Sequence, residues 1–257
     1  MLKLNDICKK FNPFTLNEVK IFDNFNLNVK KGEFVSIVGS NGSGKTTLLN
    51  LVSGNTFPDS GKIILAEKDI TRSKEHVRAR NIGRVFQDPS KGTAPEMTVA
   101  ENLAIADNKG SMYGLSLGLN KKRLEYYRET LSQLGLKLED RLDNKVGSLS
   151  GGQRQALALL ICTMSPIDLL LLDEHTAALD PKTSESIMEL TERIIKQKGI
   201  TTLMVTHNLK FAVNYGTRIL MMDKGKIIID KADKDKQSVD ISSLLKVFNE
   251  ISIECGN

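Results

Sequence analysis

The sequence predicts an α/β protein with a mainly parallel sheet, an N-terminal antiparallel β subdomain and an inserted α-helical subdomain. Three observations predict this fold. After residue 150, helical and strand-like segments alternate, which is typical of a parallel sheet wrapped by helices. In FDNFNLNV, residues 22–29, the apolar residues are spaced as in half-buried antiparallel strands. Between about residues 88 and 152 the apolar spacing becomes helical.

The N-terminal half is expected to contain short strands and one helix. The segment FVSIVG is apolar and β-branched, as in a buried parallel strand, and it leads into a Gly/Ser-rich loop. The helix TTLLNLVS follows this loop, and Gly54 ends it. Strands are predicted at Leu2–Cys8, Val19–Val29, Phe34–Gly39, Lys62–Leu65 and Ile82–Gln87.

The helical subdomain is expected next in the chain. Two loops are expected to interrupt it, at Pro89–Pro95 and Lys109–Gly118. We expect residues 1–235 to form one domain with residues 88–152 inserted, and residues 236–257 to form a short helical tail. The other predicted elements are a helix at Gln153–Met164, a strand at Leu169–Asp173, a helix at Ser184–Lys198, a strand at Thr201–Thr206, a hairpin at residues 218–230 and a helical pattern at Ser238–Glu250.

Composition indicates an ordinary globular protein. The chain has 257 residues, of which 40% are hydrophobic and 26% charged, so it can bury a good core. No apolar run approaches the roughly 18 residues of a membrane helix, and the N-terminus lacks the apolar stretch of a secretory signal. Cys8, Cys162 and Cys255 lie far apart without metal-binding spacing. We therefore expect a cytosolic chain with free thiols.

The net charge of +5 and the pI near 9.0 make the chain mildly basic. A nucleic-acid-binding protein would more often concentrate its basic residues in one stripe, whereas here they are scattered. We therefore expect no nucleic-acid partner. The clusters at Lys121–Arg123 and Lys231–Lys236 are interpreted as solvated charge, or alternatively as a weak attraction to an anionic membrane surface.

A phosphate-binding loop is predicted at residues 39–46, because GSNGSGKT matches the pattern GxxxxGK[ST] between a strand and a helix. Its glycines let backbone N–H groups point inward, and the following helix adds its positive end. Lys45 is expected to reach the β- and γ-phosphates, Thr46 to bind Mg²⁺ and Thr47 to bind a phosphate. The predicted nucleotide-binding residues of this segment are Gly39, Ser40, Asn41, Gly42, Ser43, Gly44, Lys45, Thr46 and Thr47.

The segment LLLLDE ends in two acids, Asp173 and Glu174, where a buried parallel strand would meet its ligand. We expect Asp173 to hold Mg²⁺ through water. Glu174 is the predicted general base that polarises the attacking water. The alternative is a strand that simply ends in surface acids.

The segment LSGGQ predicts a second anion-binding helix terminus, because adjacent glycines start a helix there. One chain would then have two phosphate-binding helix ends but only one lysine-bearing loop. A head-to-tail dimer is an economical solution, with each nucleotide between the loop of one subunit and this terminus of the other. The predicted nucleotide-binding residues here are Ser150, Gly151, Gly152 and Gln153.

These motifs together resemble the nucleotide-binding subunit of ABC transporters, a P-loop NTPase with a RecA-like core. The phosphate-binding loop, Gln87 in VFQD, LSGGQ, LLLLDE and His207 in LMVTH occur in the family's order. The resemblance implies an ATPase with ATP and Mg²⁺. It implies that Gln87 senses Mg²⁺ or the attacking water, and that His207 contacts the γ-phosphate unless it is a core histidine. It also places Phe11 against adenine; the alternatives are core packing of Phe11, or stacking by Phe14 instead.

Two residues depart from the family's pattern. His175 stands where the family usually has Pro, and Ala178 where it usually has Ser. The loss of a hydroxyl at Ala178 puts one cross-dimer hydrogen bond in doubt. His175 is either a group that titrates near neutral pH or a tolerated loop residue.

The resemblance further implies partners: a second ATPase subunit, expected to be identical, and membrane permease subunits that hold the chain at the cytoplasmic face of the membrane. The stretches FQDPSKGTAPEMTVAENL and LLLLDEHTAALDPKT resemble a bacterial subgroup of tryptophan or tyrosine uptake ATPases that work with a substrate-binding protein. We therefore expect import of a small solute such as an amino acid. The alternatives are the ATPase of an ABC exporter and a soluble ABC ATPase outside transport.

Overall fold

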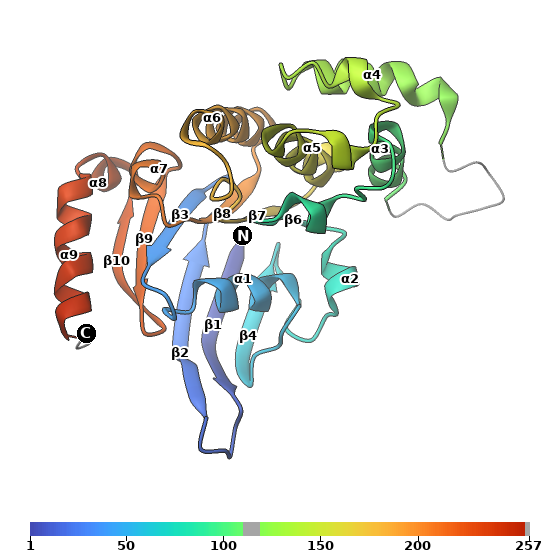
Figure 1. The fold of residues 1–257 in the computed structure, drawn as a ribbon. Coiled ribbons are helices and arrows are strands. Elements are labelled where there is room, and N and C mark those ends of the chain that lie inside the picture. The colour runs from blue at the N-terminus through green and yellow to red at the C-terminus, as the bar shows by residue number, and fades with distance from the viewer. Residues whose placement is uncertain (110–118, 255–257) are drawn as a thin grey trace.

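The computed structural model describes residues 1–109 and 119–254, with residues 248–254 described by their backbone alone. Residues 110–118 of the predicted loop and Cys255 lie outside the described residues. Figure 1 shows the chain as a sheet that separates two groups of helices, with a second, antiparallel sheet on one side. The predicted fold class is confirmed.

The larger sheet has six strands in the order β10-β9-β3-β8-β7-β6. Its members β3, β6, β7, β8 and β9 run parallel, and β10 pairs with β9 as an antiparallel hairpin. The strands span Phe34–Gly39 (β3), Ile82–Val85 (β6), Leu169–Asp173 (β7), Thr201–Val205 (β8), Arg218–Asp223 (β9) and Lys226–Ala232 (β10).

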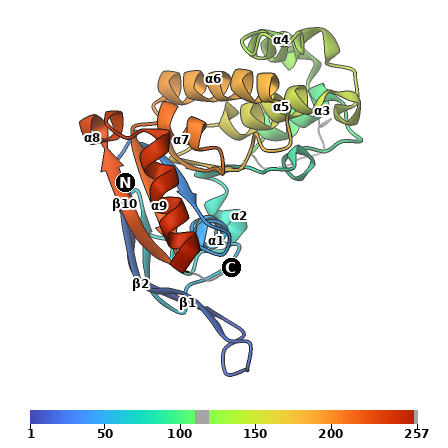
Figure 2. The ribbon, with the colours of Figure 1, turned by 60° about the vertical axis from the view of Figure 1, so that its left-hand side comes forward.

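The two faces of this sheet contribute to different cores, because successive side chains of a strand point to opposite sides. On β7, Leu169 and Leu171 face the core that contains helix α1 (Lys45–Ser53), whereas Leu170 and Leu172 face the core of α5 (Gly151–Met164) and α6 (Pro181–Lys198). The near-continuous apolar run of β7 follows from this burial on both faces. Figure 2 shows α5 and α6 together, on the side of the sheet away from α1.

The antiparallel sheet has the strand order β2-β1-β4-β5. Its strands are β1 (Leu2–Phe11), β2 (Val19–Val29), β4 (Ser60–Leu65) and β5 (Lys68–Asp69). The short helix α2 (Glu75–Arg78) leads back to β6. The predicted antiparallel pairing of the first two strands is confirmed, and β1 extends beyond Cys8 because Phe11 pairs with Val19.

The inserted segment contains α3 (Val99–Asp107) and α4 (Leu124–Ser132), as well as short 3₁₀ turns. Arg123 donates two hydrogen bonds, of 2.8 and 2.6 Å, to the two carboxylate oxygens of Asp107, and this pair joins the two helices. The helical character predicted for this segment is confirmed. The boundary of residues 88–152 as a separate subdomain stays a prediction. The 3₁₀ turns are Pro89–Gly92, Lys121–Arg123, Glu139–Arg141 and Val146–Ser148.

The C-terminal helices pack beside the hairpin. Helix α7 (Leu209–Asn214) follows β8, and α8 (Asp233–Gln237) and α9 (Ile241–Glu254) follow β10. Leu244 of α9 is 1% exposed and lies in a core with Ala212 of α7 and Ile219 of β9. The helical pattern predicted near the C-terminus is therefore present, although the domain limit at residue 235 stays a prediction.

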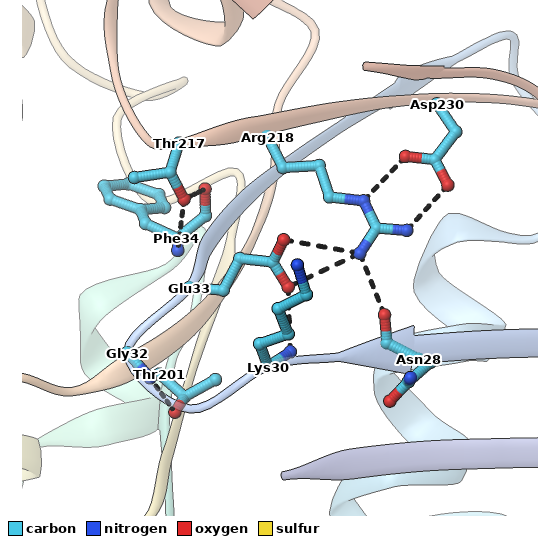
Figure 3. Close-up of polar contacts among 9 residues, drawn as sticks. All are labelled: Asn28, Lys30, Gly32, Glu33, Phe34, Thr201, Thr217, Arg218 and Asp230. Carbon is cyan, nitrogen blue, oxygen red and sulfur yellow. Dashed lines mark hydrogen bonds and ion pairs between the residues drawn. The ribbon is translucent and has the colours of Figure 1, made fainter. Parts of the chain in front are cut away.

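A polar cluster joins the two sheets where the chain passes from β2 into β3 (Figure 3). Arg218 of β9 donates two hydrogen bonds of 2.6 Å to Asp230, one of 2.8 Å to the carbonyl of Asn28, and contacts Glu33 at 3.4 Å. The Asp230 carboxylate raises the pKa of the Arg218 guanidinium. The bidentate contact with Asp230 orients the guanidinium, and its hydrogen bond to the Asn28 carbonyl ties β2 of the antiparallel sheet to β9, the neighbour of β3.

Candidate functional site

Four adjacent strands carry the predicted site residues at one edge of the larger sheet. The strands β3, β8, β7 and β6 are neighbours and parallel, so their carboxyl ends lie together. The phosphate-binding loop follows β3, His207 follows β8, Glu174 follows β7 and Gln87 follows β6. The tertiary structure therefore brings together residues that lie far apart in the sequence.

The predicted phosphate-binding loop connects β3 directly to α1. Gly44 caps α1 with φ +100°, a conformation that L side chains rarely adopt, and an added Cβ would lie 3.0 Å from the ring of Phe22. The loop therefore needs glycine at this position. Thr46 is exposed in the first turn of α1, where its hydroxyl is accessible to a ligand.

The Lys45 side chain folds back over the loop that carries it. Its Nζ donates hydrogen bonds of 2.9 Å to the carbonyl of Gly39 and 2.8 Å to that of Ser40, and approaches Ser43 Oγ at 3.4 Å. Lys45 is only 5% exposed. This burial lowers the pKa of its ammonium group, and the negative charge of Glu174 partly opposes that effect. Contact with phosphate would replace these carbonyl contacts with charged oxygens.

The Asp173 carboxylate ends β7 and is paired with Arg84 of β6. Arg84 Nη2 lies 2.7 Å from Asp173 Oδ2, and both side chains are mostly buried. Sequence reasoning missed Arg84. The available signal was a charged residue between apolar residues of a predicted strand, because an unpaired charge would be very costly if that strand is buried.

Glu174 follows β7 and contacts His207, which follows the neighbouring strand β8. The Nε2 atom of His207 lies 2.7 Å from Oε1 of Glu174. Glu174 has φ +50°, a left-handed conformation that costs a residue with a Cβ of order 1–3 kcal/mol. Its N–H donates to the carbonyl of Val205 over 3.0 Å, which helps to hold this conformation. His207 is half-exposed, so the alternative of a core histidine is wrong.

The hypothesis that His175 titrates near neutral pH is wrong. His175 is 2% exposed, and burial lowers its pKa to about 4. Its Nε2 lies 3.2 Å from the hydroxyl of Thr191, which itself donates to the carbonyl of Ile187. A hydroxyl has one hydrogen, so Thr191 accepts here and His175 is a neutral imidazole protonated at Nε2. His175 lies in the turn after β7, so it is a loop residue as the alternative held, but its side chain is buried and not at the surface.

Gln87 lies two residues beyond the end of β6 and is exposed. Buried Gln155 of α5 donates a 3.3 Å hydrogen bond to the carbonyl of Phe86, next to Gln87. The strand predicted at Ile82–Gln87 is too long by two residues, because β6 ends at Val85. The hydrogen bond from Gln155 therefore ties the backbone next to Gln87 to α5.

The segment Ser150–Gln153 begins α5 with a reciprocal capping box. Ser150 Oγ accepts from the Gln153 backbone N–H at 3.3 Å, and Gln153 Oε1 accepts from the Ser150 N–H at 3.2 Å. A Cβ on Gly152 would lie 2.4 Å from Cγ2 of Thr183, so glycine is required for α5 to approach α6. This terminus belongs to the layer opposite α1 (Figure 1).

The aromatic residues proposed to stack on adenine are accessible. Phe11 is 40% exposed at the end of β1, and Phe14 is 100% exposed in the β1–β2 turn. Lys9 Nζ lies 5.3 Å from the centre of the Phe11 ring. The alternative in which Phe11 packs as an ordinary core residue is wrong, and its role toward adenine stays a prediction.

The donor set at this edge fits Mg²⁺. Thr46, Gln87 and Asp173 offer hydroxyl, amide and carboxylate oxygens, which are the ligands that Mg²⁺ prefers. Among the residues that the structure describes, no group of three or more His, Cys, Asp or Glu side chains could hold a metal ion. A site with few protein ligands suits Mg²⁺, which usually shares its coordination with substrate phosphates and water.

Comparison with known families identifies this arrangement. The sequence model of the family described as ABC transporter matches residues 22–177. The chain belongs to the ABC transporter family. Within that family it is an ATP-binding subunit and an ATPase, as the predicted motifs implied.

This ABC subunit is similar over nearly its whole length to curated relatives. It is 48% identical to a tyrosine transport ATP-binding protein of Clostridioides difficile, over 96% of this chain and 98% of the relative. It is 31% identical to a xylose/arabinose import ATP-binding protein of Sulfolobus acidocaldarius, over 96% and 94% of the two chains. It is also 36% identical to a thiamine import ATP-binding protein of Haemophilus influenzae, over 84% and 95%.

Solved ABC cassettes share the fold. An ATP-binding cassette with a dimeric structure of a post-hydrolysis state bound to ADP and Pi has a TM-score of 0.74 and 31% identity, over 90% of this chain and 98% of that one. A nucleotide-free cassette from an ABC transporter has a TM-score of 0.79 and 28% identity, over 100% and 99%. Among the described residues of this ABC subunit, no helix is long and apolar enough to cross a membrane.

Proposed function

We propose that the chain is the ATPase subunit of an importer and hydrolyses ATP as a head-to-tail dimer. The observation that carries this proposal is the edge of the larger sheet, where the loop of Lys45 and the Glu174–His207 pair follow adjacent strands. Such an edge holds groups for binding a triphosphate and for activating water.

The proposed roles follow from the chemistry of each group. Backbone N–H groups of residues 39–44, the start of α1 and Lys45 bind the phosphates, with Thr47 adding a hydroxyl. Thr46, Asp173 and Gln87 hold Mg²⁺, which when bound would neutralise charge on the phosphate oxygens. Glu174 accepts a proton from the attacking water, and His207 orients Glu174 and contacts the γ-phosphate. Phe11 stacks on the adenine.

The dimer supplies the remaining ligands of the nucleotide. Ser150, Gly151, Gly152 and Gln153 start a helix in the layer opposite α1, so we propose that they face the nucleotide of a second, identical chain. The dimeric structure of a similar ATP-binding cassette bound to ADP and Pi supports this arrangement. Closure on ATP and opening after hydrolysis would drive the permease through the helical segment after Gln87.

The cargo proposed is a small solute, with an aromatic amino acid such as tyrosine as the first candidate. The similarity to a tyrosine transport ATP-binding protein supports this choice, and the names of several other relatives contain the word import. We further propose that permease subunits hold the chain at the cytoplasmic membrane face, together with an extracytoplasmic substrate-binding protein.

The variant Glu174→Gln tests the ATPase proposal. It should bind ATP as the wild type does, lose turnover by about 10²-fold or more, and accumulate as an ATP-bound dimer. Light scattering after gel filtration with ATP and Mg²⁺ would detect this dimer. The matched control is Lys45→Ala in the same background, which should bind ATP weakly and stay monomeric. Wild-type turnover in Glu174→Gln would contradict the assignment of the base.

Transport is tested with cells that lack the wild-type subunit. Uptake of labelled tyrosine should be restored by the wild-type chain and not by Lys45→Ala. If instead the Lys45→Ala cells accumulate more labelled tyrosine than the wild-type cells, the subunit belongs to an exporter. Co-purification with ribosomes or nucleic acid in place of a multi-span membrane protein would contradict the transport proposal.

A further inference from the structure

Arg84 places a positive charge where the strand pattern of β6 calls for a core residue. Side chains two residues apart on a strand share a face, so Arg84 lies on the same face as buried Ile82. Ile82 pairs with Leu169 and Arg84 with Leu171 on the neighbouring strand. This face belongs to the core that contains α1. A charge at such a position must be paired, because burying it alone would be very costly.

The partner of this charge is Asp173, which lies on the same face of β7, two residues beyond Leu171. Arg84 Nη2 lies 2.7 Å from Asp173 Oδ2, and the two side chains are 12% and 16% exposed. The ion pair involves Oδ2 alone. The guanidinium carbon also lies 4.9 Å from the centre of the Phe86 ring, which further restricts its orientation.

The other side of the same guanidinium contacts α1. Arg84 Nη1 donates a hydrogen bond of 2.8 Å to Asn50 Oδ1 and one of 3.3 Å to Ser53 Oγ. Asn50 follows Thr46 by one helical turn, so it lies on the same side of α1. Arg84 therefore bridges the helix that carries Thr46 and the strand that ends in Asp173.

We propose that Arg84 is a positioning residue for the magnesium site, because its guanidinium fixes the Asp173 carboxylate relative to α1 before the metal binds. This inference rests on the proposed function, in which Asp173 and Thr46 hold Mg²⁺. Groups that orient a metal-binding carboxylate contribute about 10- to 100-fold to metal affinity. The planar fork of arginine suits this task because its two terminal nitrogens bind separate partners at fixed angles, which an ammonium group cannot reproduce.

The test measures metal binding in a Glu174→Gln background, so that no readout depends on turnover. Affinity for ATP is measured with a fluorescent analogue in EDTA, and binding of Mn²⁺ as a spectroscopic substitute for Mg²⁺ is followed by electron paramagnetic resonance at saturating ATP. The variants are Arg84→Met, Arg84→Lys and Asn50→Ala. The matched control is Arg123→Met, which breaks another Arg–Asp ion pair, the bidentate contact with Asp107 in the helical segment.

We expect Arg84→Met to raise the Mn²⁺ concentration for half-saturation by about tenfold while leaving the ATP affinity in EDTA within about twofold of the parent. Arg84→Lys and Asn50→Ala should shift the Mn²⁺ midpoint in the same direction by smaller factors, since each keeps one arm of the bridge. Arg123→Met should not change it. If Arg84→Met does not fold, the Mn²⁺ midpoints of Arg84→Lys and Asn50→Ala test the proposal.

Unchanged or tighter Mn²⁺ binding in folded Arg84 variants would overturn the proposal, because the guanidinium would then be a packing group or a competitor of the metal. A lower melting temperature with an unchanged Mn²⁺ midpoint would lead to the same conclusion. Failure of the proposed function looks different: the parent itself would bind no ATP, or would bind it without any dependence on the metal.

Discussion

His207 Nε2 lies 2.7 Å from Glu174 Oε1, so the side chain of the proposed general base is in direct contact with an imidazole. The two residues follow neighbouring strands of the sheet, and the left-handed backbone of Glu174 is held by the Val205 carbonyl. A carboxylate oriented in this way is prepared to accept a proton from water, because its rotation is already restricted.

The first prediction concerns this pair. His207→Ala should lower the ATP turnover number by about 10²-fold, because Glu174 loses the group that orients it. The dissociation constant for ATP should rise less than the turnover number falls, by about tenfold, since one γ-phosphate contact is lost while Lys45 and the phosphate-binding loop remain intact. Single-turnover kinetics and equilibrium binding separate the two effects. His76→Ala, which removes an exposed histidine of α2, is the control and should behave as wild type.

The second prediction concerns acid stability. The folded chain keeps His175 neutral with a pKa of about 4, whereas the unfolded chain binds a proton near 6.5. Unfolding therefore takes up a proton between these values, and the wild type should lose up to about 3 kcal/mol as pH falls through this window. His175→Gln can still donate to Thr191 but does not titrate. Urea unfolding from pH 7 to 4 should show a flatter profile for His175→Gln, and parallel profiles would contradict the prediction.

The third prediction concerns the contact between α5 and α6. Gly152→Ala places a Cβ 2.4 Å from Cγ2 of Thr183, so the helices must separate, at a cost of about 1–3 kcal/mol in unfolding free energy. Combining it with Thr183→Ser removes that methyl group and should restore most of the loss. Chemical denaturation of the single and double variants measures this coupling. Equal losses in both would show that the clash is not the cause.

The fourth prediction concerns Lys236 in α8. Its Nζ donates to the backbone carbonyls of Tyr215 and Gly216, and burial lowers its pKa from 10.5 to about 8, with the charge of Glu192 opposing. Between these values the unfolded chain binds the extra proton, so the stability of the wild type should rise with pH relative to Lys236→Met. Thermal melts from pH 7 to 10 would measure this difference. The exposed Lys234→Met should run parallel to the wild type.

The regular elements could be predicted where local pattern and burial agree. The predicted limits of β3 and β7 match the structure residue for residue, because each is an apolar run with a clear end, at Gly39 and Asp173. The antiparallel strands were recognisable from alternation. The short elements β5, α2, α7 and α8 were not predicted, since a few residues carry too little periodicity and their stability comes from tertiary packing.

Only the site residues that belong to recognisable sequence motifs could be predicted. The phosphate-binding loop, Asp173, Glu174 and His207 each belong to a recognisable segment, and the sheet order places them at one edge. Arg84 was missed because its partners Asp173 and Asn50 lie far from it in the sequence, so neither the local pattern nor composition pairs them. The burial of His175 was missed for the same reason, since its hydrogen-bond partner Thr191 lies 16 residues further along the chain, in α6.

Some features of this chain followed from the local sequence, and others required the tertiary structure. Local residue order was enough for the strand and helix types, the phosphate-binding loop and the family, because those depend on backbone conformation and short-range spacing. The pairing of Arg84 with Asp173, the contact of His207 with Glu174 and the low pKa of His175 appeared only with the packed chain. Charges and hydrogen bonds of this kind depend on distances across strands and on burial, which chain folding alone creates.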